Sequence, residues 1–145
     1  MKPLCHKCET AAVEVGRLCL RCSLGPVWYM AAPSADLVCA REWLAAITES
    51  VDVSLVATWI SEVEVIGDDD PAQRKAGLAR CMAVIHRCDA IVLVGGSISP
   101  GMEQEDRFAF NQGIPRLDLT GCGHWPHDNP EQWISLAQAF HEGAQ

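Results

Sequence analysis

The sequence lacks several features that would indicate particular classes of protein. No apolar run is long enough to span a bilayer, and the residues after Met1 are polar and cysteine-bearing where a secretion signal would have an apolar core. No internal repeat or low-complexity segment is visible. We therefore expect a cytoplasmic protein with no membrane-spanning segment.

Positive charge is also in short supply. Lys and Arg number 11 against 19 Asp and Glu, which gives a net charge of −8. Such a chain is repelled by phosphate-rich surfaces, so broad adhesion to nucleic acid or to an anionic membrane is not expected. The 145 residues, 49% of them hydrophobic, suffice for one packed domain with a small appendage.

Cysteine is plentiful, and four of the eight cysteines form two CxxC pairs near the amino terminus. Ten residues separate the pair Cys5 and Cys8 from the pair Cys19 and Cys22. This spacing predicts a tetrahedral Zn²⁺ site in which four thiolates leave no position for water, so the metal would be structural. Disulfides or a redox pair are the alternatives, but grouped metal ligands fit a reducing compartment better.

The predicted zinc-ribbon-like lobe, residues 1–25, is too short to bury a core of its own. Metal binding would therefore supply the free energy that folds it. Its near-neutral charge favours a structural role or contact with a protein partner over binding to nucleic acid. His6 lies inside the first CxxC pair and is predicted to be a neighbour of the metal, because the four cysteines already complete the site.

Strand and helix patterns alternate over residues 26–145. Short apolar runs predict strands at residues 27–31, 53–57, 90–94 and 116–119. Helices are expected after Pro33-Ser34, after the acidic turn 67–71, from Ser99-Pro100 to about Gln112, and after Asn129-Pro130. The alternation implies a parallel sheet, and right-handed crossovers then give a three-layer α/β sandwich of flavodoxin-like or Rossmann-like type.

Two segments of this domain are less decisive. Residues 58–70 fit no element well, although their aspartates at 68–70 are predicted to form a turn and a helix cap in preference to a metal site. Cys122, His124 and His127 could form a second ligand set, but Trp125-Pro126 indicates an ordinary loop there.

The segment from residue 89 to residue 118 carries the strongest functional signal. A strand at residues 90–94 ends in Gly95 and Gly96, and the helix that begins at Ser99 places Glu105 on its apolar face, together with Met102, Phe108 and Ala109. Helical side chains lean toward the amino terminus, so this carboxylate would tilt toward the glycine-rich loop. That loop lies at the carboxyl edge of the sheet, where open α/β sheets bind ligands.

Three local patterns resemble the nucleoside 2-deoxyribosyltransferase family and the related 2′-deoxynucleoside 5′-phosphate N-hydrolases. They are Tyr29-Met30-Ala31-Ala32-Pro33 in the first strand, Asp89-Ala90-Ile91-Val92 in the third, and Ser99-x-Gly101-x-x-x-Glu105-x-x-x-Ala109 in the helix. A weaker similarity covers Thr58-Trp59-Ile60. The resemblance spans about residues 27–119 and leaves out the predicted zinc-ribbon-like lobe.

The resemblance implies cleavage or transfer of the N-glycosidic bond of a 2′-deoxynucleoside or its 5′-monophosphate. Glu105 would attack the anomeric carbon, and water or a second base would resolve the glycosyl ester. Ser99 and the backbone near Gly101 would hold the 5′-hydroxyl or 5′-phosphate at the helix amino terminus. The full substrate-binding set that the resemblance implies is Tyr29, Trp59, Asp89, Gly95, Ser99 and Gly101.

One position departs from the family pattern. The family places an aspartate that assists the leaving base eight residues before the position of Asp89, and this chain has Cys81 there. Cysteine titrates far above a carboxylic acid and is a poor proton donor to a departing base. The leading hypothesis is an active N-glycosidase or transferase, in which a neighbouring subunit of a homo-oligomer would supply any missing group. The first alternative is a catalytically impaired nucleotide-binding protein that contacts a protein or nucleic-acid partner through its zinc lobe. The second alternative is a zinc-ribbon adaptor that binds nucleic acid.

Overall fold

The computed structural model describes residues 24–143. The four cysteines predicted to bind zinc lie outside these residues, and so does the predicted zinc-ribbon-like lobe up to residue 23. The α/β domain expected from residue 26 onward is described up to Gly143.

A four-stranded sheet forms the centre of the described domain, and all its strand pairs are parallel. The strand order is β2-β1-β3-β4. The strands are β1 (Val27–Ala31), β2 (Ser54–Val56), β3 (Ala90–Leu93) and β4 (Arg116–Asp118). The four strands and their parallel arrangement, predicted from the sequence, are thus confirmed. Each predicted strand end lies within one residue of the observed end.

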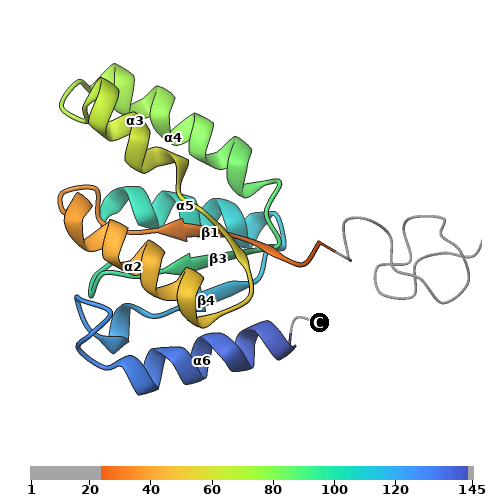
Figure 1. Ribbon diagram of the computed structural model, residues 1–145. Helices are drawn as coiled ribbons and strands as arrows, with labels where there is room; N and C mark the ends of the chain where they lie inside the picture. The colour runs from red at the N-terminus through yellow and green to blue at the C-terminus, as the bar shows by residue number, and fades with distance from the viewer. Residues whose placement is uncertain (1–23, 144–145) are drawn as a thin grey trace, which may run out of the picture.

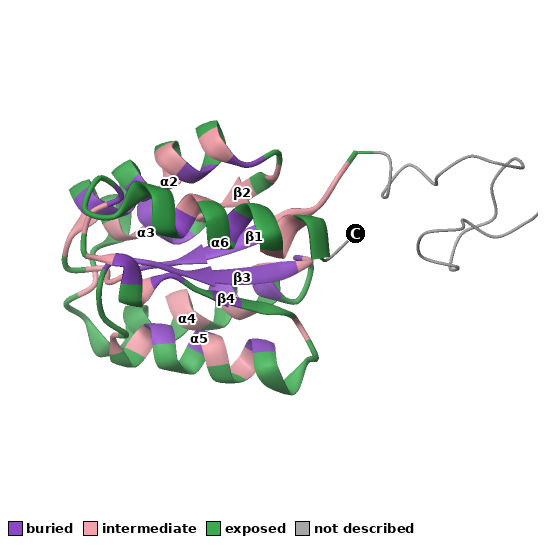
Figure 2. Ribbon diagram, turned by 90° about the horizontal axis from the view of Figure 1, so that it is seen from below, coloured by how far each residue is buried: buried purple, intermediate pink, exposed green. Residues whose placement is uncertain are grey.

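Helices cover both faces of the sheet, which makes three layers (Figures 1 and 2). On one face lie α2 (Leu37–Ser50) and α6 (Pro130–Gly143), and on the other lie α4 (Pro71–Ile85) and α5 (Pro100–Asn111). A short helix, α3 (Thr58–Ile66), precedes α4, and a single 3₁₀ turn, η1 (Thr120–Cys122), follows β4. None of the described helices is long and apolar enough to cross a membrane.

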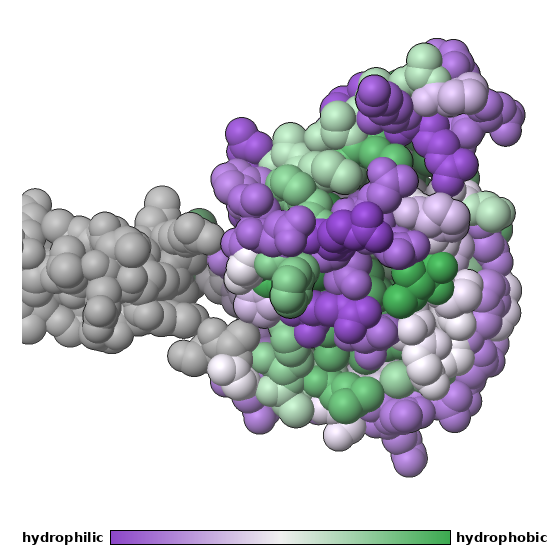
Figure 3. Space-filling model, turned by 180° about the vertical axis from the view of Figure 1, so that it is seen from behind, coloured by the Kyte–Doolittle hydropathy of each residue, from purple (hydrophilic) through white to green (hydrophobic). Residues whose placement is uncertain are grey.

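The core lies where the two central strands meet the helices. Every residue of β3 and the last four residues of β1 are buried, as expected for strands covered on both faces. On one face, the rings of Trp43 and Trp133 join α2 to α6 in an edge-to-face contact with centroids 5.4 Å apart. On the molecular face seen in Figure 3, by contrast, apolar side chains occur in separate groups among polar ones.

The start of α2 differs from the sequence prediction, which placed it at Pro33-Ser34. The helix begins at Leu37, because the Asp36 side chain accepts a hydrogen bond from the Cys39 backbone N–H at 3.0 Å and acts as the N-cap. Pro33 instead packs beside Gly95, and the Ser34 hydroxyl donates to Asp68 at 2.8 Å. The loop after β1 is therefore longer than predicted and reaches two other loops.

Residues 58–66, which the sequence left unassigned, form α3. The sequence Thr-Trp-Ile-Ser-Glu-Val-Glu-Val-Ile is rich in β-branched residues, and its N-cap residue, Ala57, makes no side-chain capping bond. Packing decides the conformation, since Trp59 and Ile60 are both buried. In addition, the Trp59 indole N–H donates to the Met30 carbonyl at 2.8 Å and fixes the start of α3 against β1.

Candidate active site

The sheet has a topological switch point between β1 and β3. The chain leaves β1 through α2 toward β2 and leaves β3 through α5 toward β4, so the two connections diverge on opposite faces. Between the carboxyl ends of two such strands, open α/β sheets form a crevice that binds ligands.

Glu105 lies on α5 at this edge and points inward, as the helical periodicity predicts. It is 7% exposed and is the buried charged residue of the described chain. Ser99 caps the helix by accepting a hydrogen bond from the Met102 N–H at 3.3 Å, and Pro100 occupies the first turn. The cap fixes the register of α5, which turns Glu105 toward the sheet.

The carboxyl group of Glu105 has an unusual electrostatic environment. Its Oε2 atom is buried without a hydrogen-bond partner among the described residues. Burial raises the pKa of Glu105 to about 7, and the nearby Tyr29 side chain opposes this only in part. Glu105 is therefore divided between its acid and carboxylate forms at neutral pH.

Tyr29 and Cys81 adjoin Glu105 and share its buried surroundings. Burial is the main cause that raises the pKa of the Tyr29 hydroxyl far above its usual range, and the negative charge of Glu105 adds to it. Burial likewise raises the pKa of the Cys81 thiol to about 11. Both groups hold their protons at neutral pH. The Tyr29 hydroxyl is close enough to Glu105 and Cys81 to affect their pKa values, but within the described part it makes no hydrogen bond of good geometry.

A pocket opens next to Glu105, between the α3–α4 pair on one side and α5 with the loop after β1 on the other. Its cavity volume is about 70 Å³, and its mouth is open to solvent. Four residues that the sequence analysis singled out line it together: Trp59, Ser99, Gly101 and Glu105. The pocket also contains Cys81, at the position where the resembled family has its second acid.

The outer wall of the pocket carries charged pairs that sequence reasoning missed. Arg80 donates to Glu62 at 2.9 Å, which links α4 to α3. Asp68 accepts from Ser34 at 2.8 Å and lies 3.9 Å from Arg74. The position of these residues beside the pocket depends on α3. This helix forms part of the pocket wall and brings the acidic turn that follows it to the switch point. The sequence did not predict α3, so it did not predict these pairs.

Three residues of the predicted substrate-binding set do not line the pocket. Tyr29 is fully buried behind it, next to Glu105. Asp89 precedes β3 at the opposite end of the sheet, where its Oδ2 atom accepts a hydrogen bond from the Val27 N–H at 2.8 Å. Gly95 follows β3 at the correct edge, but a Cβ there would lie 2.7 Å from the Cδ atom of Pro33, so the glycine permits close contact between two loops.

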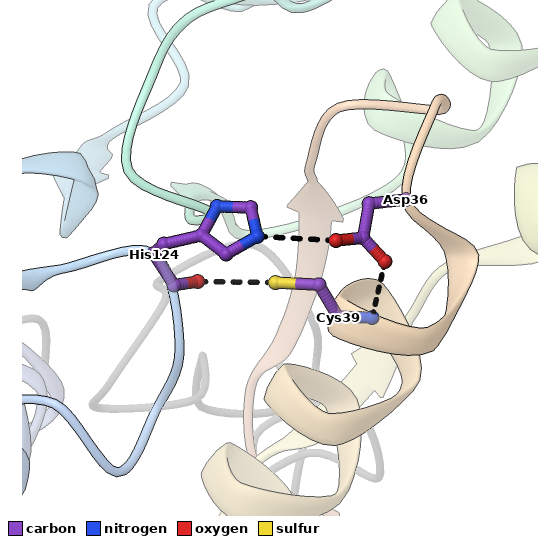
Figure 4. Close-up of side chains that lie close together, drawn as sticks. All are labelled: Asp36, Cys39 and His124. Atoms are coloured by element: carbon purple, nitrogen blue, oxygen red, sulfur yellow. Dashed lines mark hydrogen bonds and ion pairs between the residues drawn. The ribbon is translucent and has the colours of Figure 1, made fainter.

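A second group of polar side chains lies at the same sheet edge, formed by Asp36, Cys39 and His124 (Figure 4). Their potential ligand atoms all lie within 4.8 Å of one another. His124 Nε2 is 3.1 Å from Asp36 Oδ2, and the Cys39 thiol donates to the His124 carbonyl at 3.0 Å. Within residues 24–143 this is the group that could hold a metal ion, so His124 does not join Cys122 and His127 in the ligand set considered from the sequence.

The fold and the pocket define a Rossmann-like α/β domain with an acidic group at its switch point. Residues 32–118 match a protein family described as a domain of unknown function, DUF7768, and the chain belongs to this family. The matched region includes the Trp59, Ser99, Gly101 and Glu105 positions of the pocket. No curated protein and no solved structure matches the chain.

Proposed function

We propose that the protein cleaves or transfers the N-glycosidic bond of a 2′-deoxynucleoside or its 5′-monophosphate, with Glu105 as nucleophile. The observation that carries the proposal is a buried carboxyl group with an unpartnered oxygen beside a pocket at the switch point. Leaving such an atom unpaired is costly in a folded protein, and a reacting atom of a ligand would give it a partner.

The chemistry requires the carboxylate form of Glu105. Its oxygen attacks the anomeric carbon, the bond to the base breaks, and a glycosyl ester forms that water or another base then resolves. A 2-deoxy sugar suits this reaction, because it lacks the electron-withdrawing 2′-hydroxyl that would disfavour positive charge in the transition state. Ser99 and Gly101 would position the 5′ end of the substrate at the amino terminus of α5.

A direct test is the release of free base from a panel of deoxynucleosides and their 5′-monophosphates, followed by chromatography. We expect release by the wild-type protein and a loss of at least about 10³-fold for Glu105→Gln, since the amide is not a nucleophile. Glu103→Gln is the matched control, because Glu103 lies on the same helix but is exposed and pairs with Arg107 at 3.2 Å. Activity that persists in Glu105→Gln would refute the assignment of the nucleophile.

A second function is favoured by Cys81. With its pKa raised to about 11, this thiol cannot readily protonate a departing base. The protein would then be a nucleotide-binding protein that retains the pocket without turnover, unless a neighbouring copy of the chain supplies the acid. Thermal stabilisation by a deoxynucleotide without release of base would support the binding function and contradict the catalytic one.

The amino-terminal lobe would serve either function. We propose that Cys5, Cys8, Cys19 and Cys22 bind one structural Zn²⁺ ion and that the lobe contacts a protein partner. This proposal comes from the spacing of the cysteines alone, since they lie outside the described residues. Metal analysis of a variant in which all four are serine would test it, with the loss of one zinc ion per chain expected.

A further inference from the structure

We infer that Asp36, Cys39 and His124 form a second metal site, one that takes a single divalent transition-metal ion of the Zn²⁺ class. The site differs from the amino-terminal four-cysteine cluster and does not depend on the proposed glycosidase function. It joins the loop between β1 and α2 to the segment that follows η1, segments far apart in the sequence that meet at the carboxyl edge of the sheet (Figure 4).

The hydrogen bonding of the imidazole is the first argument. The Nδ1 atom of His124 lies 2.9 Å from the Gly95 carbonyl, which can only accept, so Nδ1 carries a proton. The Nε2 atom faces a second acceptor, Asp36 Oδ2, at 3.1 Å. Two lone pairs cannot face each other at this distance, so a proton or a cation must lie between them. Metal-binding histidines are commonly oriented in the same way, because the ring nitrogen that does not bind the metal donates a hydrogen bond to a carbonyl or carboxylate oxygen. Nδ1 of His124 makes such a bond with the Gly95 carbonyl.

The position of Cys39 is the second argument, and it favours a metal ion over a proton. The thiol comes from the first turn of α2, and its Sγ atom lies within 4.8 Å of both other ligand atoms. An ion pair between histidine and aspartate needs no third donor, whereas a metal ion uses one. Two ligands on one tetrahedral zinc ion are separated by roughly 3.3 Å, close to the 3.1 Å between Nε2 and Oδ2.

The backbone around the site is fixed before any metal binds. The His124 carbonyl accepts the Trp43 indole N–H at 2.8 Å as well as the Cys39 thiol, and Asp36 Oδ1 caps α2 while Oδ2 stays directed at His124. On binding, Cys39 would release its thiol proton to solvent and give up its hydrogen bond to the His124 carbonyl, forming a sulfur–metal bond. The proton between His124 Nε2 and Asp36 Oδ2 would also be released to solvent, so that both atoms can bind the metal. Three protein ligands leave a fourth position for water.

The nature of the ligands indicates the class of metal. Imidazole, thiolate and carboxylate together suit Zn²⁺, and tetrahedral Co²⁺ replaces it as a coloured probe. Mg²⁺ and Ca²⁺ prefer all-oxygen sites and are not expected to bind here.

The experiment counts zinc ions on the full-length chain after reconstitution with Zn²⁺ and gel filtration, using native mass spectrometry. We expect His124→Gln to retain one zinc ion fewer than the wild type. His127→Gln is the matched control, because His127 is an exposed histidine in the same loop, 3.9 Å from Glu42, and should leave the count unchanged. Counting differences between variants separates this ion from any ion held by the amino-terminal cysteines.

Two further variants protect the test against loss of fold. Asp36→Asn keeps an N-cap residue for α2, and Cys39→Ser keeps a donor to the His124 carbonyl. Each should also lose one zinc ion while keeping its helical circular dichroism, and Cys39→Ser should lower the thiolate-to-cobalt absorption of the Co²⁺ form. If folded His124→Gln, Asp36→Asn and Cys39→Ser all retain the wild-type count, the site is only a hydrogen-bonded contact and the proposal is overturned.

Discussion

Burial of Glu105 destabilises the folded protein, but it also suits the chemistry proposed for this residue. A buried carboxyl group with a free oxygen is destabilising when charged, because the protein interior solvates the charge less well than water does. The same desolvation makes its carboxylate a stronger nucleophile once a substrate covers it. Residues that weaken the fold in this way tend to occur at functional sites.

The stability of the protein should therefore depend on pH through Glu105. Its pKa rises from 4.5 in the unfolded chain to about 7 in the folded one, so the folded state binds the proton more tightly. Tighter proton binding by folded Glu105 contributes about 3 kcal/mol to the free energy of unfolding. This contribution is fully present below the unfolded pKa and is lost as the pH rises through about 7. Urea denaturation of wild type and Glu105→Gln at pH 5 and pH 8 measures this.

The expected result is that Glu105→Gln gains stability relative to the wild type between pH 5 and pH 8. Glu103→Gln, which changes an exposed glutamate of the same helix, should follow the wild type at both pH values. An equal response of all three proteins would mean that Glu105 is not buried as described.

The activity should rise with pH over the range in which the stability falls. Because the nucleophile is the carboxylate, kcat/KM for base release should rise with pH through about 7, where Glu105 ionises in the free enzyme. A pH–rate profile between about pH 4 and pH 9 measures this. An acidic limb centred near the ordinary glutamate pKa would contradict the assignment.

At the scale of elements, helix caps set where the pocket walls begin. Asp70 caps α4 by accepting a hydrogen bond from the Ala72 N–H at 2.9 Å, and Pro71 occupies the first turn. The sequence predicted this cap and the cap of α5 at Ser99, because Asp-Pro and Ser-Pro are strong local signals. It could not predict α3, whose local sequence favours no helix and which depends on the burial of Trp59 and Ile60.

Asp70→Ala should destabilise the protein by about 1 kcal/mol through loss of the cap. Asp69→Ala is its control, because it removes the same charge from the same exposed turn and leaves the capping bond in place. Thermal or urea unfolding of both variants gives the comparison. An equal loss in the two would assign the effect to charge near the helix terminus and not to the hydrogen bond.

At the scale of the whole molecule, the loops after β1 and β3 meet at the switch point. Gly95 has φ of +101° and approaches Pro33, while its carbonyl contacts His124. The candidate metal site lies on one side of this contact, and the pocket includes Ser34 of the same β1 loop. A change at Gly95 is therefore expected to reach both sites.

Gly95→Ala should destabilise the protein more than Gly113→Ala does. Both glycines have positive φ, but a Cβ at Gly113 meets no atom within 4 Å, whereas at Gly95 it lies 2.7 Å from Pro33. Backbone strain costs about 1 kcal/mol or more in each, and the clash adds to it only at Gly95. Urea denaturation of the two variants measures the difference, and equal losses would show that the loops are free to separate.

The sequence by itself determined the alternating elements, the parallel sheet and the inward direction of Glu105, because apolar periodicity and helix caps are local properties. Tertiary structure alone decided the position of α3, the charged pairs on the pocket wall and the meeting of Asp36 and Cys39 with His124. These depend on contacts between residues far apart along the chain, such as the 88 positions between Asp36 and His124. A local pattern cannot specify such contacts, because their free energy arises only when the whole sheet has brought the segments together.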